Sequence, residues 1–450
     1  MAKRFWVFSA DHSGLPLAVR LKDEGNEVTL VLIRPEEKNG KWKPPADAKE
    51  QKKNQDKIKY LNSNGNGLVD KMWAADAMPR IKRTDYVIFD QLYGFQFGEI
   101  LRKRGCKVLG GSEVGYTLET ERDETLKLLK SLGLDTPPQQ KFGKGQSQKG
   151  IDFLEKAQDA AMYVLKSDNP AVVTQVACDS NDELIQKITA EAKDIDSAPF
   201  LLQEKVDGTE FAVETWYSNG IPVIANVDIE QKRKYNESCE VQTGCSYDIL
   251  WMIPIDHPLR ERVNGPFDKY AAKEIGTGLL DLSVIYDHKA DKMYCLEVCG
   301  SRFAYNAFYA MLSLLTIPVG DFLANFLDGK YRDDVTDSIF MQEPAYSCSL
   351  RVFNDDHTPD QMISYPKEDK ESLWLWDVHR KGGKLLTTGD EATGIITAQG
   401  ENPEGGMAEI RQKWFKYNMS TAWCRDDYDE DDEPCLPLAR YHRMQRNNLI

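Results

Sequence analysis

Two charged residues, Lys166 and Glu297, lie in strongly apolar segments of the sequence. Lys166 follows the apolar run 162–165, and a lysine at the end of a buried strand can neutralise phosphate oxygens. Glu297 lies in the middle of the apolar segment 295–299, where a buried carboxylate needs a cationic partner or a bound Mg²⁺. Taken alone, Lys166 is more simply explained as a solvated strand end. Glu297 fits a structural ion pair as well as it fits a metal ligand.

The segment 203–210 reads Gln-Glu-Lys-Val-Asp-Gly-Thr-Glu and predicts two strands joined by a tight turn at its Asp-Gly pair. Such a segment can hold a nucleotide, because strand backbone groups can pair with an adenine edge while the last carboxylate reaches the ribose hydroxyls. The candidate nucleotide contacts are Gln203, Glu204, Val206 and Glu210. An ordinary β-hairpin with exposed charges explains the same pattern, and it is favoured when the segment is taken alone.

The elements that must position these residues change in character along the chain. Apolar strands alternate with helical segments up to residue 112, which predicts a parallel sheet with right-handed crossovers. The predicted strands of this part are 4–8, 28–33, 86–89 and 107–109, and the charged stretch 35–54 is predicted to be a loop or lid. Hairpins are predicted for 200–217 and 282–298, and strands dominate after residue 330. We therefore expect three domains: 1–112, then 113–330 with a lid at about 135–197, and a β-rich domain at 331–450.

Composition excludes several classes of protein. The 450 residues include 57 Lys and Arg against 72 Asp and Glu, and the formal charge of −15 argues against broad nucleic-acid binding. No apolar run is long enough to span a membrane, and the short N-terminal apolar stretch lacks the pattern of a signal peptide. The nine cysteines form no Cys-x-x-Cys pair, which favours reduced thiols. We expect a cytoplasmic protein.

The order of the candidate motifs carries more information than any one of them. In chain order they are Glu119 and Arg122, Lys166, the segment 203–210, Glu230-Gln231-Lys232-Arg233, Gln242-Thr243-Gly244, Leu296-Glu297, and the segments 386–389, 396–400 and 424–426. This series resembles phosphoribosylamine–glycine ligases, members of the ATP-grasp superfamily, nearly from end to end of the chain. The basic run at 232–235 could by itself be an exposed turn, and its place in this order makes a role in binding an anionic substrate equally plausible.

The resemblance implies the fold and the reaction. The expected fold is mixed α/β and α+β, with a Rossmann-like N-terminal domain, a two-lobed ATP-binding centre and a β-rich C-terminal domain. The expected cofactors are ATP and Mg²⁺ (or Mn²⁺). ATP would phosphorylate a glycine-like carboxylate, and an amine would attack the acyl phosphate to form an amide. The expected partners are small molecules, and the oligomeric state could be monomer or dimer.

The resemblance also assigns roles to residues. Glu297 and Lys166 would be catalytic, Glu297 would hold the metal, and ATP would contact Arg122, Lys166, Gln203, Glu204, Val206 and Glu210. The substrate would contact Lys232, Arg233, Thr243, Gly244 and Arg302.

Three segments depart from the family pattern. The stretch 167–174 has no glycine where the family has a glycine-rich loop. Cys299 replaces a metal-binding asparagine, for which Asn306, Asp281 or water could substitute. The N-terminal Gly-Gly-Arg-Glu-His of the family becomes Asp-His-Ser-Gly-Leu at 11–15, without the arginine. Two alternatives therefore remain: a diverged ligase acting on another amine, such as a modified nucleotide, or a scaffold that binds without turnover.

Overall fold

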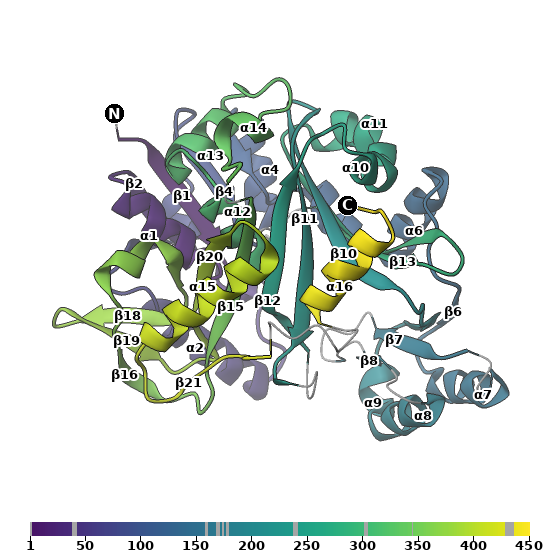
Figure 1. Cartoon of the computed structure of the whole chain (residues 1–450). Helices are drawn as coiled ribbons and strands as arrows, with labels where there is room; N and C mark the ends of the chain where they lie inside the picture. Colours follow the sequence, from purple (N-terminus) through teal and green to yellow (C-terminus); the bar gives the residue numbers. More distant parts are fainter. Residues whose placement is uncertain are drawn as a thin grey trace. The chain divides into compact units, whose positions relative to one another are not determined.

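The computed structural model describes residues 2–37, 43–157, 161–167, 172, 175–176, 180–236, 242–300, 305–343, 345–427 and 436–450 (Figure 1). The chain divides into two compact units. The first consists of Met1–Glu121, Phe211–Leu282 and Val298–Ile450, and the second of Arg122–Glu210 and Ser283–Glu297. The division into three domains remains a prediction.

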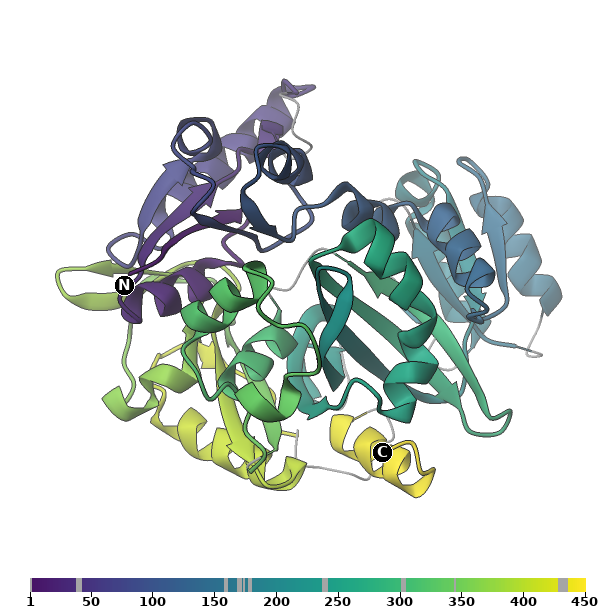
Figure 2. The same ribbon diagram turned by 90° about the horizontal axis from the view of Figure 1, so that it is seen from above.

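A five-stranded parallel sheet forms the N-terminal part of the first unit, in the order β3-β2-β1-β4-β5. Its strands are β1 (Arg4–Ser9), β2 (Glu27–Leu32), β3 (Asp70–Trp73), β4 (Tyr86–Phe89) and β5 (Lys107–Leu109). Phe5 and Val7 pack in one core with α1 (Leu15–Asp23), whereas Trp6 and Phe8 pack in another with α3 (Ala74–Ala77) and α4 (Phe95–Lys103). Both faces of the sheet are therefore covered by helices, as expected for apolar parallel strands (Figure 2).

The stretch 35–54 differs from its predicted loop. It contains a 3₁₀ turn, η1 (Pro35–Glu37), and the start of α2 (Ala48–Ser63). Asp47 caps this helix by accepting a hydrogen bond of 2.8 Å from the backbone N–H of Glu50. Leu61 is the one buried residue of α2, so the helix has almost no apolar periodicity for sequence reasoning to detect.

A nine-stranded sheet has the order β14-β13-β10-β11-β12-β15-β20-β17, with β21 beside β15. Its strands are β10 (Thr209–Ser218), β11 (Ile221–Arg233), β12 (Gln242–Ile253), β13 (Gly278–Asp287), β14 (Lys292–Cys299), β15 (Tyr346–Asn354), β17 (Leu373–Leu375), β20 (Ala392–Gly400) and β21 (Ala422–Trp423). The C-terminal strands thus extend the same sheet as β10 to β12. A separate small sheet contains β16 (Pro359–Ile363), β19 (Lys384–Thr388) and β18 (Val378–Lys381).

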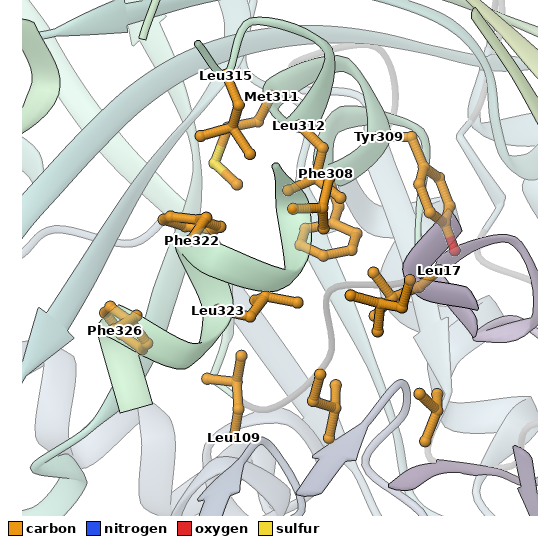
Figure 3. Close-up of a cluster of buried hydrophobic side chains, with 14 of the residues drawn as sticks. Leu17, Leu109, Phe308, Tyr309, Met311, Leu312, Leu315, Phe322, Leu323 and Phe326 are labelled. Carbon is orange, nitrogen blue, oxygen red and sulfur yellow. The ribbon is translucent and has the colours of Figure 1, made fainter. Parts of the chain in front are cut away.

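The largest core of the first unit surrounds α12 (Asn306–Ser313) and α13 (Val319–Leu327). Figure 3 shows Phe308 and Leu312 of α12 close to Phe322 and Leu323 of α13. The apolar stretch in this region therefore forms two short core helices. Among the described residues, no helix is both long enough and apolar enough to cross a membrane.

The second unit contains a sheet of order β6-β9-β7-β8. Its strands are β6 (Gln139–Phe142), β7 (Tyr163–Ser167), β8 (Gln175–Val176) and β9 (Phe200–Glu204), and its helices are α6 (Arg122–Ser131), α7 (Ser147–Ala157), α8 (Asn181–Ala190) and α9 (Ala192–Ile195). The predicted hairpin at 200–217 is wrong, because β9 pairs with β6 and β7 while β10 pairs with β11. The strands were located well from local sequence, but their partners are distant in the chain.

The other helices are short or terminal. They are α5 (Glu113–Thr120), α10 (Pro258–Val263), η4 (Gly265–Phe267), α11 (Asp268–Tyr270), η5 (Ala271–Ile275), α14 (Thr336–Ile339), η6 (Lys367–Ser372), α15 (Pro403–Lys416) and α16 (Pro437–Arg446). Sequence reasoning did not detect α16, which packs against β11 and β12 and places the hydroxyl of Tyr441 2.7 Å from that of Tyr346.

Candidate functional site

One face of the small sheet of the second unit packs against helices, and the other carries both polar and apolar side chains. β7 and β9 are antiparallel, with Lys166 opposite Leu201. Because side chains alternate along a strand, Gln203 shares the face of Leu201 and therefore that of Lys166. The other face carries Leu165 and Leu202, which pack with α7 and α8. The helices cover one face of the sheet, and the predicted ATP-binding residues Lys166 and Gln203 lie on the other.

Lys166 connects this sheet to the segment that carries Glu297. Its Nζ donates a hydrogen bond of 3.3 Å to the backbone carbonyl of Leu296, and its side chain is half-buried. Leu296 directly precedes Glu297 in β14. The structure therefore brings the two predicted catalytic residues into adjacent positions within the second unit, although they are far apart in the sequence.

Glu297 is not buried, which corrects the expectation from its apolar surroundings. Its side chain is exposed, whereas Cys295 and Val298 of the same strand are buried. The strand β14 lies at one end of its sheet, and an edge strand can present a charged side chain to solvent. The hydroxyl of Ser283 donates to Oε1 of Glu297 at 3.4 Å. Within the described part of the chain, no group of three His, Cys, Asp or Glu residues has the geometry of a metal site.

The segment predicted to contact adenine is held by backbone hydrogen bonds. The N–H of Glu204 donates to the carbonyl of Pro138 at 2.8 Å, and the N–H of Lys205 donates to the carbonyl of Met162 at 2.7 Å. The side-chain amide of Gln203 donates to Oε1 of Gln139 at 3.2 Å. The segment is therefore fixed on both sides.

The remaining predicted ATP contacts lie at the boundaries of elements. Val206 and Glu210 are half-buried on either side of Gly208, and Arg122 is the first residue of α6. A Cβ at position 208 would lie 2.4 Å from the carbonyl oxygen of Tyr286. Glycine is needed here for the close approach of two backbone segments, not for a positive φ.

Four of the predicted substrate contacts lie together where β11 and β12 pair in the first unit. The backbone of Arg233 is opposite Gln242, and the hydroxyl of Thr243 donates to the carbonyl of Lys232 at 3.2 Å. Lys232 Nζ lies 3.8 Å from Oε2 of Glu230. Gly244 lies near Arg351, whose guanidinium nitrogens would be 3.7 Å from a Cβ at position 244. Arg302 lies outside the described residues.

Sequence reasoning missed a group of buried carboxylates beside these contacts. Asp228 and Asp248 are buried in β11 and β12, and burial raises the pKa of both well above the ordinary value, with Glu230 adding to the effect. The strand register places Glu230 opposite Asp248 and Asp248 opposite Ser349. These positions are 18 to 119 residues apart, so no local spacing could reveal that they share a face. Their grouping depends on the register alone.

The hollows of the first unit's surface near α2 do not contain the predicted contacts. One of about 490 Å³ is lined by Gln55, Ile58, Lys59, Asn62, Ser63 and Asn66. This hollow is therefore not part of the candidate site.

No protein-family model and no curated protein sequence matches the chain. Phosphoribosylamine–glycine ligase from Thermotoga maritima matches with a TM-score of 0.67 at 16% identity, over 94% of this chain and 99% of that one. Biotin carboxylase from Campylobacter jejuni, solved as a β,γ-ATP complex, matches with a TM-score of 0.61 at 12% identity, over 94% and 93%.

A third solved structure extends the series. Carboxyaminoimidazole ribonucleotide synthase from Aspergillus clavatus, complexed with ATP, matches with a TM-score of 0.56 at 12% identity, over 92% of this chain and 98% of that one. All three are ATP-grasp enzymes. The chain therefore has the ATP-grasp fold, which confirms the fold predicted from the order of the sequence motifs.

Proposed function

We propose that this chain, with its ATP-grasp fold, joins a carboxylate to an amine at the expense of ATP. The observation that carries the proposal is the position of Lys166, whose Nζ lies 3.3 Å from the carbonyl of Leu296 and hence beside Glu297. A lysine and a carboxylate at neighbouring positions suit the binding of a triphosphate and its metal ion. The similar folds solved with ATP support this assignment.

The proposed reaction has two steps. A carboxylate oxygen of the first substrate attacks the γ-phosphorus of ATP, the bond to the β-phosphate oxygen breaks, and ADP leaves. The nitrogen of the amine then attacks the carbonyl carbon of the acyl phosphate, and phosphate leaves as the nitrogen loses a proton. Lys166 would neutralise negative charge on the transferring phosphoryl group, and Gln203, Glu204, Val206 and Glu210 would hold the nucleoside.

Glu297 is the residue that would hold Mg²⁺ or Mn²⁺. Its exposed carboxylate fits this role, because Mg²⁺ is commonly bound through one or two carboxylates together with substrate phosphates. When bound, the ion would neutralise the charge that develops on the phosphates during transfer. Arg122 would add a positive charge on the nucleotide side.

The two substrates are proposed from the family resemblance. A glycine-like carboxylate and phosphoribosylamine form the pair suggested by the resemblance to phosphoribosylamine–glycine ligase, with Lys232, Arg233, Thr243, Gly244 and Arg302 as the contacts. Another amine is the alternative. A place in purine biosynthesis and a cytoplasmic location remain predictions.

Turnover can be tested without knowing the amine, because hydroxylamine traps acyl phosphates as hydroxamates. The protein would be incubated with Mg-ATP, a panel of carboxylates and hydroxylamine, and ADP and hydroxamate would be measured. We expect one carboxylate to give both products. Lys166→Ala and Glu297→Gln should each lower kcat/KM by about 100-fold or more, since each removes a charge that stabilises the transition state.

Matched surface variants control for loss of charge alone. Lys193→Ala and Glu155→Gln change exposed residues of the same unit and should leave kcat/KM within twofold of the wild type. Full activity in both Lys166→Ala and Glu297→Gln would contradict the site assignment. A thermal shift with ATP but no ADP with any carboxylate would instead favour the scaffold without turnover.

A further inference from the structure

We propose that α2 and the hairpin of β18 and β19 form a surface that binds the sugar–phosphate backbone of a nucleic acid. The inference goes beyond the proposed ligase and does not depend on it, because it concerns a different part of the first unit. Three observations carry it: a local excess of positive charge, cations without acidic partners, and amide side chains beside them.

The helix α2 has a charge opposite to that of the whole chain. Its 16 residues include five lysines against two acids, whereas the formal charge of the chain is −15. Leu61 is its one buried residue, so most of the helix surface faces solvent. An exposed basic helix on an acidic protein attracts an anionic partner and confines that partner to one place.

Four lysines of α2 are exposed and make no ion pair within the part of the chain that the structure describes. They are Lys49, Lys52, Lys53 and Lys59. Exposed lysines elsewhere in the same unit do have acidic partners. Lys273 lies 2.6 Å from Glu274, and Lys330 lies 3.6 Å from Asp328. The positive charge of α2 is therefore available to an external anion.

The β18–β19 hairpin lies against the turn that follows α2 and adds more positive charge. The N–H of Arg380 donates to the carbonyl of Asn66 at 2.7 Å, and the N–H of Gly65 donates to the carbonyl of Val378 at 2.7 Å. The hairpin carries three exposed cations, none of which makes an ion pair with another described residue: Arg380, Lys381 and Lys384. These three side chains and the four lysines of α2 are called the basic surface below.

Amide side chains accompany the lysines along α2. The open hollow of about 490 Å³ is lined by Gln55, Ile58, Lys59, Asn62, Ser63 and Asn66. Residues three or four positions apart share a face of a helix, so Lys52, Gln55 and Lys59 form one line. The 16 residues of α2 span about 24 Å, which is long enough to face about seven nucleotides of a strand.

This composition favours a nucleic acid over other anionic partners. Lysines bind phosphate as point charges, and Asn and Gln side chains commonly contact phosphate and sugar. An acidic peptide suits arginine forks, but the basic surface has one arginine, Arg380. A membrane surface requires several apolar side chains, and Ile58 is the one apolar residue among the six described residues of the hollow. Those six include no aromatic ring on which a base could stack, so base sequence should matter little.

Titration of a labelled oligonucleotide tests the proposal directly. A fluorescein-labelled single-stranded DNA of about 16 nucleotides would be titrated with the full-length chain at about 50 to 200 mM NaCl, and fluorescence anisotropy would be measured. We expect binding at low salt, with a slope of log K against log[NaCl] of about −3.5 to −5 for five to seven phosphate contacts. A DNA of unrelated sequence and an RNA of the same sequence should bind within about threefold, because they share the phosphates.

Variants of equal net charge locate the effect. Combining Lys49→Gln, Lys52→Gln, Lys53→Gln and Lys59→Gln should weaken binding at least tenfold. Combining Arg380→Gln, Lys381→Gln and Lys384→Gln should weaken it at least threefold. The control combines four changes of exposed lysines elsewhere in the same unit and should bind within twofold of the wild type: Lys82→Gln, Lys103→Gln, Lys273→Gln and Lys330→Gln. Circular dichroism should show an unaltered fold, because every changed side chain is exposed.

Asp56 allows a variant of opposite effect. This exposed acid of α2 is three or four positions from Lys52, Lys53 and Lys59. Asp56→Asn removes a charge that repels phosphate and should tighten binding at least twofold. A gain in affinity cannot result from misfolding.

Competitors separate the possible partners. Poly-glutamate of the same length and phosphatidylserine vesicles should each displace the labelled DNA at least fivefold less effectively, per negative charge, than unlabelled DNA. The proposal is overturned if no binding occurs at about 50 mM NaCl, if the quadruple α2 variant binds like the wild type, or if either competitor displaces the DNA as well as unlabelled DNA does. Hydroxamate formation is measured without nucleic acid, so failure of this inference and failure of the ligase remain distinguishable.

Discussion

At the scale of single residues, Asp248 is a buried carboxyl group beside other acidic residues. Burial and the nearby Glu230 make a carboxylate at this position costly to ionise, whereas an asparagine of nearly the same size carries no charge to desolvate. Residues that oppose stability are commonly retained for function. The stability of an Asp248 variant therefore reports on the local physics, independently of any substrate.

We expect Asp248→Asn to raise the free energy of unfolding of the first unit by about 1–3 kcal/mol at pH 7. Urea unfolding followed by tryptophan fluorescence would measure the change, with Asp333→Asn as the control expected to change little. A destabilised Asp248→Asn variant would show that the hydrogen bonds from Ser349 to the carboxyl group outweigh the cost of burying it.

The increase in the free energy of unfolding caused by Asp248→Asn should depend on pH. Burial raises the pKa of Asp248 well above the ordinary value of 3.8, so the folded state holds its proton where the unfolded state has lost it. The stability contributed by this group is present below pH 3.8 and is lost as the pH rises through the folded-state pKa. The advantage of Asp248→Asn over the wild type should therefore grow as the pH rises from 4 upward.

At the scale of elements, the loop between β1 and α1 contains a second buried titratable group. His12 adopts a positive φ of 70°, and its Nε2 lies 2.9 Å from the carbonyl oxygen of Leu61, so Nε2 carries the proton of the neutral ring. Burial lowers the pKa of His12 to about 3. The loop is therefore built around an uncharged imidazole.

This loop should make the fold sensitive to acid. Because the unfolded state takes up a proton near pH 6.5 and the folded state resists it, the contribution of His12 is lost as the pH falls from 6.5 toward 3. The slope is at most about 1.4 kcal/mol per pH unit. His12→Asn, which tolerates a positive φ, should remove this dependence. A constant difference in unfolding free energy between the two proteins from pH 4 to 7 would contradict the assignment.

Elements also show what local sequence can and cannot predict. The strands β4 and β5 were predicted at their observed bounds, because each is a short apolar run with clear ends. The pairing of β9 with β10 was wrong, since it depends on competition among distant strands. The exposure of Glu297 was missed because an edge position is a property of the sheet. The position of Asp248 opposite Glu230 and Ser349 follows only from the register across three strands.

At the scale of the whole molecule, the fold is similar to that of three solved ATP-grasp enzymes at 12–16% identity. The order of motifs could be read from the sequence because it follows the chain. The buried carboxylates could not, because they meet only in the folded sheet.

The transfer of one oxygen atom tests the central claim most directly. The carboxylate substrate identified by hydroxamate formation would be labelled with ¹⁸O in its carboxylate, and the phosphate released during turnover with an amine would be analysed by mass spectrometry. An acyl-phosphate ligase must transfer one ¹⁸O from the carboxylate to each phosphate, in proportion to ADP. Phosphate without ¹⁸O, formed together with ADP, would show hydrolysis of ATP by water and would contradict the account.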